Sequence, residues 1–130
     1  MNKQSGYQPP KSTEELVQRY NAGERYFSDI DIADGSDLSN TRLDNSTFFQ
    51  GYLTDIDFRG ASLRHVRFLD CNVKCSNFQG ADLEGAVFKG SSVEAAYFGN
   101  ANLTNVSFAG AHFCGYELKE SDMPDEQGLL

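Results

Sequence analysis

Large apolar side chains recur at every fifth position along most of this chain. From Leu38 to Leu118, all 17 positions in this register are Leu, Phe or Val, and eight of the ten phenylalanines occupy it. Neither an α-helix, with a period of 3.6 residues, nor a simple β-strand, with a period of 2, would keep such a stripe on one face. The pattern therefore predicts a repeat architecture in which the chain turns after every fifth residue.

The positions around the large residues follow a second rule. The residue two before each large residue is mostly small, as at Ser46, Ala61 and Ala81, and the residue two after it is often Gly, Asn or Asp. Gly, Asn and Asp tolerate the positive φ or the tight turn that a corner needs. We therefore predict that five residues form one side, with the large and the small residue inward and the polar residues outward.

These five-residue units resemble the pentapeptide-repeat family, whose unit is Ala-(Asp/Asn)-Leu followed by two variable residues. Good matches are Ala81–Gly85 and Ala101–Asn105, and the helix exit Ala22–Phe27 is similar to that of cyanobacterial-type short members. The resemblance implies a right-handed quadrilateral β-helix with four repeats per coil. The expected fold class is an all-β solenoid with a short N-terminal α-helical cap.

The four-repeat order is visible in the residues themselves. If the large residues are assigned in turn to four sides, starting from Leu38, side two is all Leu and side three is all Phe. Side one contains Leu38, Phe58, Phe78, Phe98 and Leu118; side two contains Leu43, Leu63, Leu83 and Leu103; side three contains Phe48, Phe68, Phe88 and Phe108; side four contains Leu53, Val73, Val93 and Phe113. We expect these residues to form the structural core, a narrow stack of Phe and Leu ladders without room for a pocket.

Four segments are expected along the chain: a flexible leader over residues 1–11, a capping helix over 12–23, the pentapeptide-repeat β-helix over 24–120 and a tail over 121–130. The leader contains Pro9 and Pro10, which favour an extended path. We expect it to be disordered or loosely draped over the molecule.

The helix is marked by signals at both ends. Ser12 and Glu15 form a capping-box pair, and Gly23 suits the left-handed position that ends a helix. An apolar stripe of Leu16, Val17 and Tyr20 follows helical spacing. So short a helix is marginal alone, and we expect the stripe to dock on the first coil as a cap; a separate partner-binding helix is the alternative.

The first coil is imperfect. Phe27 and Ile32 are five positions apart and fit its first two inward positions, but Leu38 follows six positions later. One residue is therefore inserted between Ile32 and Leu38, which we expect to form a bulge near Asp34 and Gly35.

The C-terminal end of the stack needs a cover, because an open coil exposes unpaired backbone and apolar side chains. Tyr116 occupies a position that calls for a small inward residue, and Ser121–Met123 resembles one more repeat before Pro124. The end is closed either by its own tail or by a second copy, so a homodimer through the C-terminal end stays open.

Composition narrows the functional classes. The net charge is −8, of which −6 lies on residues 27–120, an excess that disfavours direct binding to nucleic acid or to an anionic membrane. The sequence contains neither a long apolar span nor the apolar core of a secretory signal. Three cysteines do not make a disulfide framework, so we expect a cytoplasmic protein.

No group of residues forms a recognisable reactive site. His65 and His112 lie on different sides, Cys71 takes an inward slot, and Cys75 and Cys114 lie about two coils apart, roughly 9–10 Å, too far for a disulfide. We expect no catalytic residue, no metal site, no cofactor and no small-molecule substrate, and hence no enzyme.

One outer surface stands out. Phe49, Leu69, Val87 and Ala109 are outward positions of side three, at stacked or neighbouring sites, whereas the other sides are mostly polar with isolated aromatics at Tyr52 and Tyr97. A contiguous apolar stripe suggests a contact face. The alternative is a set of isolated exposed residues, or a stripe that the N-terminal leader covers.

Two functional hypotheses remain. The first is a non-enzymatic interaction or scaffold module that binds an unidentified protein partner. The second comes from the resemblance, because gyrase-protecting relatives are acidic rods that mimic DNA. The sign of the charge agrees with it, but the acids are offset by basic residues along the repeat and the rod is short.

Overall fold

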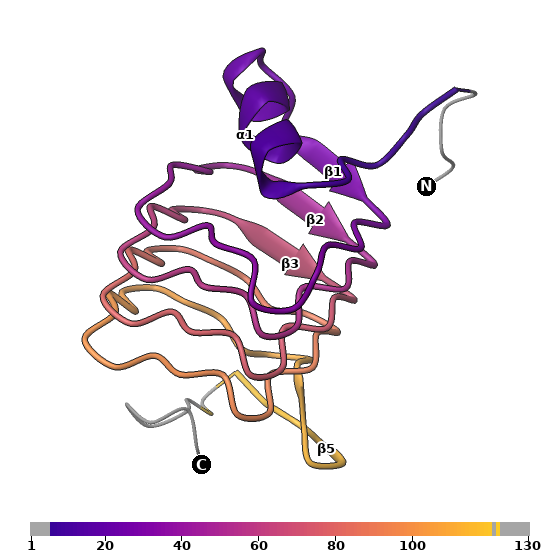
Figure 1. The fold of residues 1–130 in the computed structure, drawn as a ribbon. Helices are drawn as coiled ribbons and strands as arrows, with labels where there is room; N and C mark the ends of the chain where they lie inside the picture. Colours follow the sequence, from indigo (N-terminus) through magenta and orange to yellow (C-terminus); the bar gives the residue numbers. More distant parts are fainter. Residues whose placement is uncertain (1–5, 121, 123–130) are drawn as a thin grey trace.

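A computed structural model describes residues 6–120 and 122. Figure 1 shows stacked coils with one helix over the N-terminal end. The elements are α1 (Thr13–Asn21), β1 (Tyr26–Ser28), β2 (Thr47–Phe49), β3 (Arg67–Leu69), β4 (His112–Phe113) and β5 (Tyr116–Glu117). Turns and single β-bridges make up most of the chain between these elements, so the regular feature of the fold is the stacking of its coils.

Successive coils pair in parallel, and from Asp37 onward each bridged residue pairs with the one four repeats later. β2 pairs with β3 through Phe48 and Phe68, and single bridges continue the same register, as between Asp82 and Asn102. This pairing agrees with four five-residue sides per coil. The right-handed sense of the coil stays a prediction.

The inward register forms the core. Of its residues, Leu103 and Phe113 are partly buried, and the others from Leu38 to Leu118 are buried. On side three, the rings of Phe48, Phe68 and Phe88 stack with centroids 5.5 and 5.0 Å apart. Phe68, Phe88 and Phe108 also meet rings of the opposite ladder, on side one, edge to face, at 6.1 Å for Phe68 and Phe78. Offset stacks and edge contacts are the arrangements that ring quadrupoles favour.

The corners behave as the sequence predicts. Every residue two after a large position, from Asn40 to Gly115, has positive φ. Most are Gly, Asn or Asp, but Ala95 adopts φ 59° without the benefit of either a missing Cβ or a polar side chain. The regular stacking of the coils therefore imposes the corner conformation even on a residue that disfavours it.

The small inward residues have a second role that composition did not reveal. At corners such as that of Ala81, the N–H donates to the carbonyl of the preceding large residue, Phe78, at 2.9 Å. At three corners of the described chain, a side chain from the next coil inserts between these two groups and binds both. The inserted groups are the Cys71 thiol between Gly51 N–H and Phe48 C=O, the Ser76 hydroxyl between Ile56 N–H and Leu53 C=O, and the Ser91 hydroxyl between Cys71 N–H and Phe68 C=O.

Ser91→Ala should therefore destabilise the fold although it removes one oxygen. The hydroxyl donates to Phe68 C=O at 2.8 Å and accepts from Cys71 N–H at 3.0 Å, and both groups lie in the core. We expect a loss of about 1–3 kcal/mol in the free energy of unfolding, measured with urea. The neighbouring Ser92→Ala, at a half-buried outward position, should change it by less than about 0.5 kcal/mol. Equal losses would contradict the inserted hydroxyl.

The insertion in the first coil lies one step earlier than predicted. Asp31 pairs with Tyr52, one position further along than four repeats, whereas Asp37 pairs with Asp57, which is four repeats on. The Asp34 carboxylate accepts the Thr54 hydroxyl, also four repeats on. Ile32 and Ala33 therefore lie opposite Leu53 alone. The predicted bulge at Asp34 and Gly35 is wrong, because these two residues form the regular corner that all later coils share.

The helix α1 closes the N-terminal end. Ser12 accepts the Glu15 N–H at 3.1 Å as N-cap, but Glu15 reaches back to Lys11 N–H rather than to Ser12, so the predicted capping box is shifted by one residue. Ala22 is the C-cap and Gly23 follows at φ 107°. Leu16 is fully buried in the core cluster, which is the docked arrangement that the stripe predicts.

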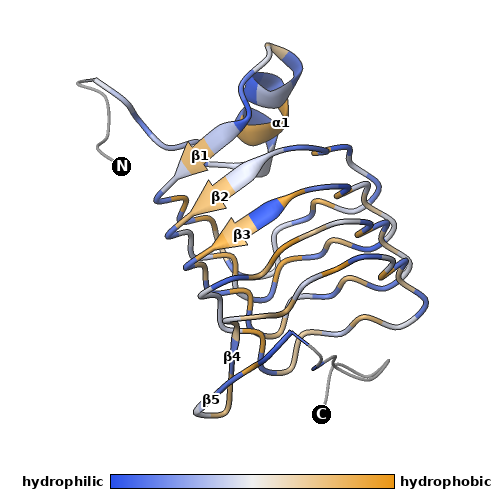
Figure 2. Ribbon diagram, turned by 180° about the vertical axis from the view of Figure 1, so that it is seen from behind, coloured by the Kyte–Doolittle hydropathy of each residue, from blue (hydrophilic) through white to orange (hydrophobic). Residues whose placement is uncertain are grey.

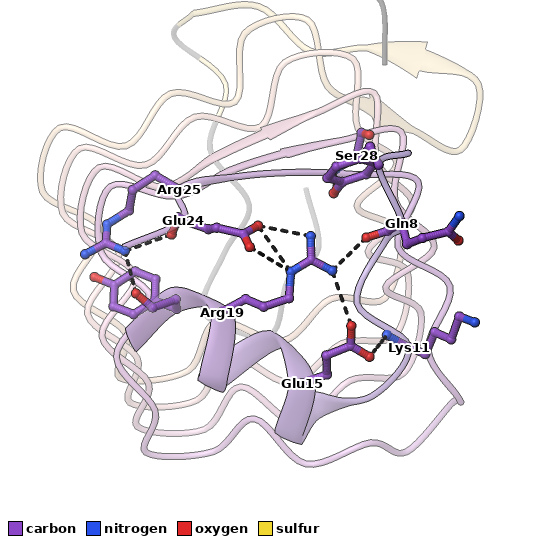
Figure 3. A network of polar contacts seen from close by, with 9 residues as sticks. Gln8, Lys11, Glu15, Arg19, Glu24, Arg25 and Ser28 are labelled. Atoms are coloured by element: carbon purple, nitrogen blue, oxygen red, sulfur yellow. Dashed lines mark hydrogen bonds and ion pairs between the residues drawn. The ribbon is translucent and has the colours of Figure 1, made fainter. Parts of the chain in front are cut away.

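An arginine joins the leader, the helix and the first coil (Figure 3). Arg19 binds Glu24 with N–O distances from 3.0 Å, Glu15 at 3.3 Å and the carbonyl of Gln8 at 2.7 Å. Tyr7 lies under its guanidinium, and the Tyr7 hydroxyl accepts the N–H of Ser28 on β1. The part of the leader that the structure describes, from residue 6, is thus docked, whereas a loose path was expected.

The C-terminal end departs from the predicted coil. After Phe113 the chain turns at Cys114 and Gly115, and β5 returns antiparallel to β4. Tyr116, for which the inward slot is too small, is 70% exposed at the start of the return. The β-helix predicted over 24–120 therefore ends near residue 113, although Leu118 still becomes buried. The predicted extra repeat at 121–123 lies largely outside the described residues.

Candidate functional site

Phe49 and Leu69 are neighbours on the outer surface of side three. β2 and β3 pair in parallel with Phe49 opposite Leu69 and Thr47 opposite Arg67. Figure 2 shows the apolar ends of both strands side by side, next to the polar start of β3. Both side chains are half-buried, so each keeps an apolar surface in contact with solvent.

The other two members of the predicted contact face lie apart from this pair. Val87 bridges Arg67 and Ser107 and so belongs to the other outward column of side three. Ala109 lies two coils beyond Leu69, with Lys89 at the position between them. Both are half-buried. The structure thus gives an apolar pair with two separate small residues rather than one continuous stripe.

The apolar pair lies in a shallow depression. It has a volume of about 240 Å³ and is lined by Phe49, Arg67, Leu69, Asp70 and Lys89. The two cations were not predicted as part of this surface. The signal was present, because Arg67 stands two positions before Leu69 and Lys89 stands four repeats after it.

The charges of side three differ from those of sides one and two. On sides one and two, each arginine forms an ion pair with a nearby carboxylate at 3.4 Å or less. The pairs are Arg42–Asp44, Arg59–Asp57, Arg64–Asp82 and Arg64–Glu84. Arg67 and Lys89 are exposed, and neither forms an ion pair with any residue that the structure describes. The apolar pair is therefore flanked by two positive charges on a chain of net charge −8.

A second depression, of about 340 Å³, crosses the corner between sides three and four. Its lining is mostly polar and includes Tyr52, which is 61% exposed, and Cys71. Burial raises the pKa of the Cys71 thiol to about 11, so the thiol stays protonated at neutral pH and serves the corner hydrogen bonds. A thiol in this state is a poor nucleophile.

The remaining reactive side chains are scattered. His65 is a corner residue, His112 belongs to β4, and Cys75 and Cys114 are exposed free thiols. Within residues 6–120 and 122, no group of three or more His, Cys, Asp or Glu is arranged to hold a metal. The helix that the structure describes is too short to cross a membrane.

Asp44 is a buried carboxylate of the repeat. Burial disfavours its charged form, but hydrogen bonds from the Ser62 hydroxyl at 2.7 Å, the Arg64 N–H at 2.9 Å and Arg42 outweigh that effect and lower the pKa of Asp44. Its backbone carbonyl accepts the Tyr20 hydroxyl of α1 at 2.9 Å. Asp44 thus fixes the corner on which the helix is docked, a structural role.

This lowered pKa predicts an acid-dependent loss of stability. The stabilisation from Asp44 is present above the unfolded-state pKa of about 3.9 and is lost as pH falls through the lower folded-state pKa. Urea unfolding at pH 6 and pH 3 should show a larger loss of unfolding free energy for the wild type than for Asp44→Asn. The same loss in both proteins would contradict the ionised, hydrogen-bonded state.

Comparisons with known proteins agree on one repeat family. The family described as "Pentapeptide repeat region" matches residues 27–98, and that described as "Pentapeptide repeats (9 copies)" matches residues 75–122. A comparison with curated proteins finds no match.

Among solved structures, the chain is similar to a pentapeptide repeat protein from Nostoc PCC 7120, with 25% identity and a TM-score of 0.46 over 95% of this chain and 98% of that one. It is also similar to HetL of Nostoc sp. strain PCC 7120, a protein involved in heterocyst differentiation regulation. The identity is 22% and the TM-score is 0.45, over 77% of this chain and 46% of that one. A third similar structure is QnrB1, a plasmid-mediated fluoroquinolone resistance protein, with 18% identity and a TM-score of 0.40 over 69% of this chain and 58% of that one.

Proposed function

The chain belongs to the pentapeptide-repeat family, and from that premise we propose that it is a non-enzymatic protein-binding module on a right-handed quadrilateral β-helix. The partner contacts the outer surface of side three. The observation that carries this proposal is the adjacent, half-buried pair Phe49 and Leu69, whose remaining apolar surface faces solvent. Apolar surface with polar residues at its edge is typical of a contact site.

The filled interior supports a binding role over a catalytic one. Stacked rings from Phe27 to Phe108 occupy the axis with centroids 5.0–5.7 Å apart along side three. The two depressions that involve side three are shallow, and the thiol in the one at the corner is protonated and hydrogen-bonded. A small-molecule substrate would ordinarily need a deeper, enclosing cleft. The expected cytoplasmic location, with free thiols, remains part of the proposal.

Self-association through the C-terminal end is a second element of the proposal. Leu103 and Phe113, in the last turn of the coil, are only partly buried, unlike their counterparts in earlier coils. A second copy placed end to end would cover them. Light scattering over a range of concentrations should then give the mass of a dimer, and a monomer at every concentration would exclude it.

A DNA mimic that binds and inhibits or protects gyrase is the second candidate function, favoured by the net charge of −8. The local ion pairs of sides one and two speak against it, because they neutralise part of the acidic surface. Supercoiling by purified gyrase, with the protein titrated in, separates the candidates. Inhibition at low protein concentration favours the mimic, and no effect favours the binding module.

The double variant Phe49→Asp/Leu69→Asp should abolish partner binding while the fold remains. Both side chains are half-buried, so carboxylates there remain hydrated and place charge in the apolar contact. Capture of partners from a source lysate, quantified against the wild type, is the measurement. Tyr97→Asp, at an outward position of side one that is 36% exposed, is the matched control.

Circular dichroism must show the same folded spectrum for both proteins. If the double variant captures the same partners with the same yield as the wild type, the proposed surface is wrong.

A further inference from the structure

We propose that the surface around Phe49 and Leu69 binds an extended acidic segment of a partner protein, in which a carboxylate lies two positions from an apolar side chain. The inference rests on the proposed function and specifies the partner's chemistry. Three features carry it: the apolar floor, the two cations beside it, and the spacing between them.

The floor would receive one apolar side chain. Phe49 and Leu69 lie in paired strands, and paired strands are about 4.8 Å apart. Their exposed surfaces line a depression of about 240 Å³, enough for part of a Leu or Phe side chain. Because the depression is shallow, a contact of this kind alone is weak and needs further interactions at its edge.

The cations supply those interactions. Arg67 lies two positions before Leu69 in β3, about 7 Å along the strand, and Lys89 follows Leu69 one coil further, about 4.8 Å away. Both line the same depression. Neither forms an ion pair within the described chain, in contrast to Arg42, Arg59 and Arg64. Their charges are free to meet carboxylates, and Arg67 presents a planar fork that suits bidentate binding.

The spacing suits an extended chain. Side chains on one face of an extended segment recur about every 6.6–7 Å, close to the separation of Arg67 from Leu69. A segment with Asp or Glu, one spacer and then an apolar residue would therefore place a carboxylate at the cation and the apolar group on the floor. Lys89 lies across the strands from Leu69, in the next coil, rather than further along β3, so its flexible side chain adds a second positive charge beside the same segment.

The acidic character of the rest of the molecule disfavours larger polyanions. A net charge of −8 repels nucleic acid and anionic membranes, whereas a short segment needs to approach only one surface. At physiological salt, repulsion beyond about 8 Å is largely screened. Asp70, at the edge of the depression, disfavours a further acid at that corner and so limits the acids to the positions near the cations.

A random-peptide library displayed on phage and selected on the immobilised full chain tests this chemistry. The enriched peptides should share an apolar residue with Asp or Glu two positions away. The best peptide, made synthetically and labelled, should bind by fluorescence anisotropy, with an affinity that falls as salt rises. Arg67→Glu/Lys89→Glu should weaken its binding about tenfold or more, and Lys74→Glu, an exposed lysine of side four, should not.

The outcomes separate the inference from the proposed function. Enriched peptides that are neutral or basic, but lose binding in Phe49→Asp/Leu69→Asp, overturn the acidic partner and leave the surface in place. Binding that is insensitive to Phe49 and Leu69 overturns both. No enrichment overturns the acidic segment. Self-association in light scattering that Arg67→Glu/Lys89→Glu abolishes makes a second copy the occupant, which also overturns it.

Discussion

Phe68→Ala is expected to cost about 3–5 kcal/mol in the free energy of unfolding. Phe68 is fully buried, stacks on Phe48 and Phe88 at 5.5 and 5.0 Å, and meets Phe58 and Phe78 edge to face at 6.1 Å. Its removal leaves a cavity that five-residue sides, held by coils above and below, cannot close by collapse.

Chemical unfolding of Phe68→Ala and of Phe49→Ala compares the same substitution at an inward and an outward position. Phe49 is outward and half-buried, so its truncation should cost clearly less. Domains of this size are stable by about 5–15 kcal/mol, and Phe68→Ala should therefore lower the unfolding midpoint strongly. Equal costs for both variants would contradict the inward assignment of the register.

Leu16→Ala is expected to cost about 2–5 kcal/mol, because α1 closes the end of the stack. Leu16 is fully buried in the same cluster as the Phe ladders, and the Tyr20 hydroxyl anchors the helix to Asp44 C=O at 2.9 Å. Loss of the leucine leaves the first coil with an exposed apolar end and weakens every contact of the cap.

Chemical unfolding should show this loss, and hydrogen exchange should show where it acts. Amides of β1 should exchange faster in Leu16→Ala, whereas those near Phe98 should change less. Val17→Ala, a partly buried neighbour, is the control and should have a smaller effect. Wild-type stability of Leu16→Ala would indicate that the helix is independent of the coil and favour a separate partner-binding role.

The repeat was predictable because its constraint is periodic. A large residue at every fifth position, with alike residues four repeats apart, leaves few arrangements other than stacked sides, and the pairing of Phe48 with Phe68 follows from it. The corners were predictable for the same reason, since each repeats the same backbone conformation.

The departures were harder to predict because each depends on one contact rather than on a period. The reversal after Phe113 depends on positive φ at both Cys114 and Gly115, which a regular corner does not need, and it leaves Tyr116 exposed. The docking of the leader depends on Arg19 and Tyr7, which are close only in the folded chain. The hydroxyl of Ser91 bridges two backbone groups, and the sequence does not show that these two groups need a hydrogen-bond partner.

The candidate surface was predicted in part. Its apolar members follow from the outward positions of side three, but their grouping depends on which column each occupies, so that Val87 and Ala109 lie apart from Phe49 and Leu69. In the sequence, Arg67 and Lys89 look like basic residues that neutralise part of the acidic charge of the repeat. Only the positions of the other ion pairs reveal that these two are left beside the apolar pair.

The most direct measurement is nuclear magnetic resonance of the ¹⁵N-labelled chain with the tightest-binding peptide of the library. If side three is the binding surface, the amide signals of β2, β3 and Lys89 should shift with added peptide, and those around Tyr97 on side one should stay in place. Shifts centred on Tyr97 or on the β4–β5 hairpin, with β2 and β3 unchanged, would contradict the proposed binding surface.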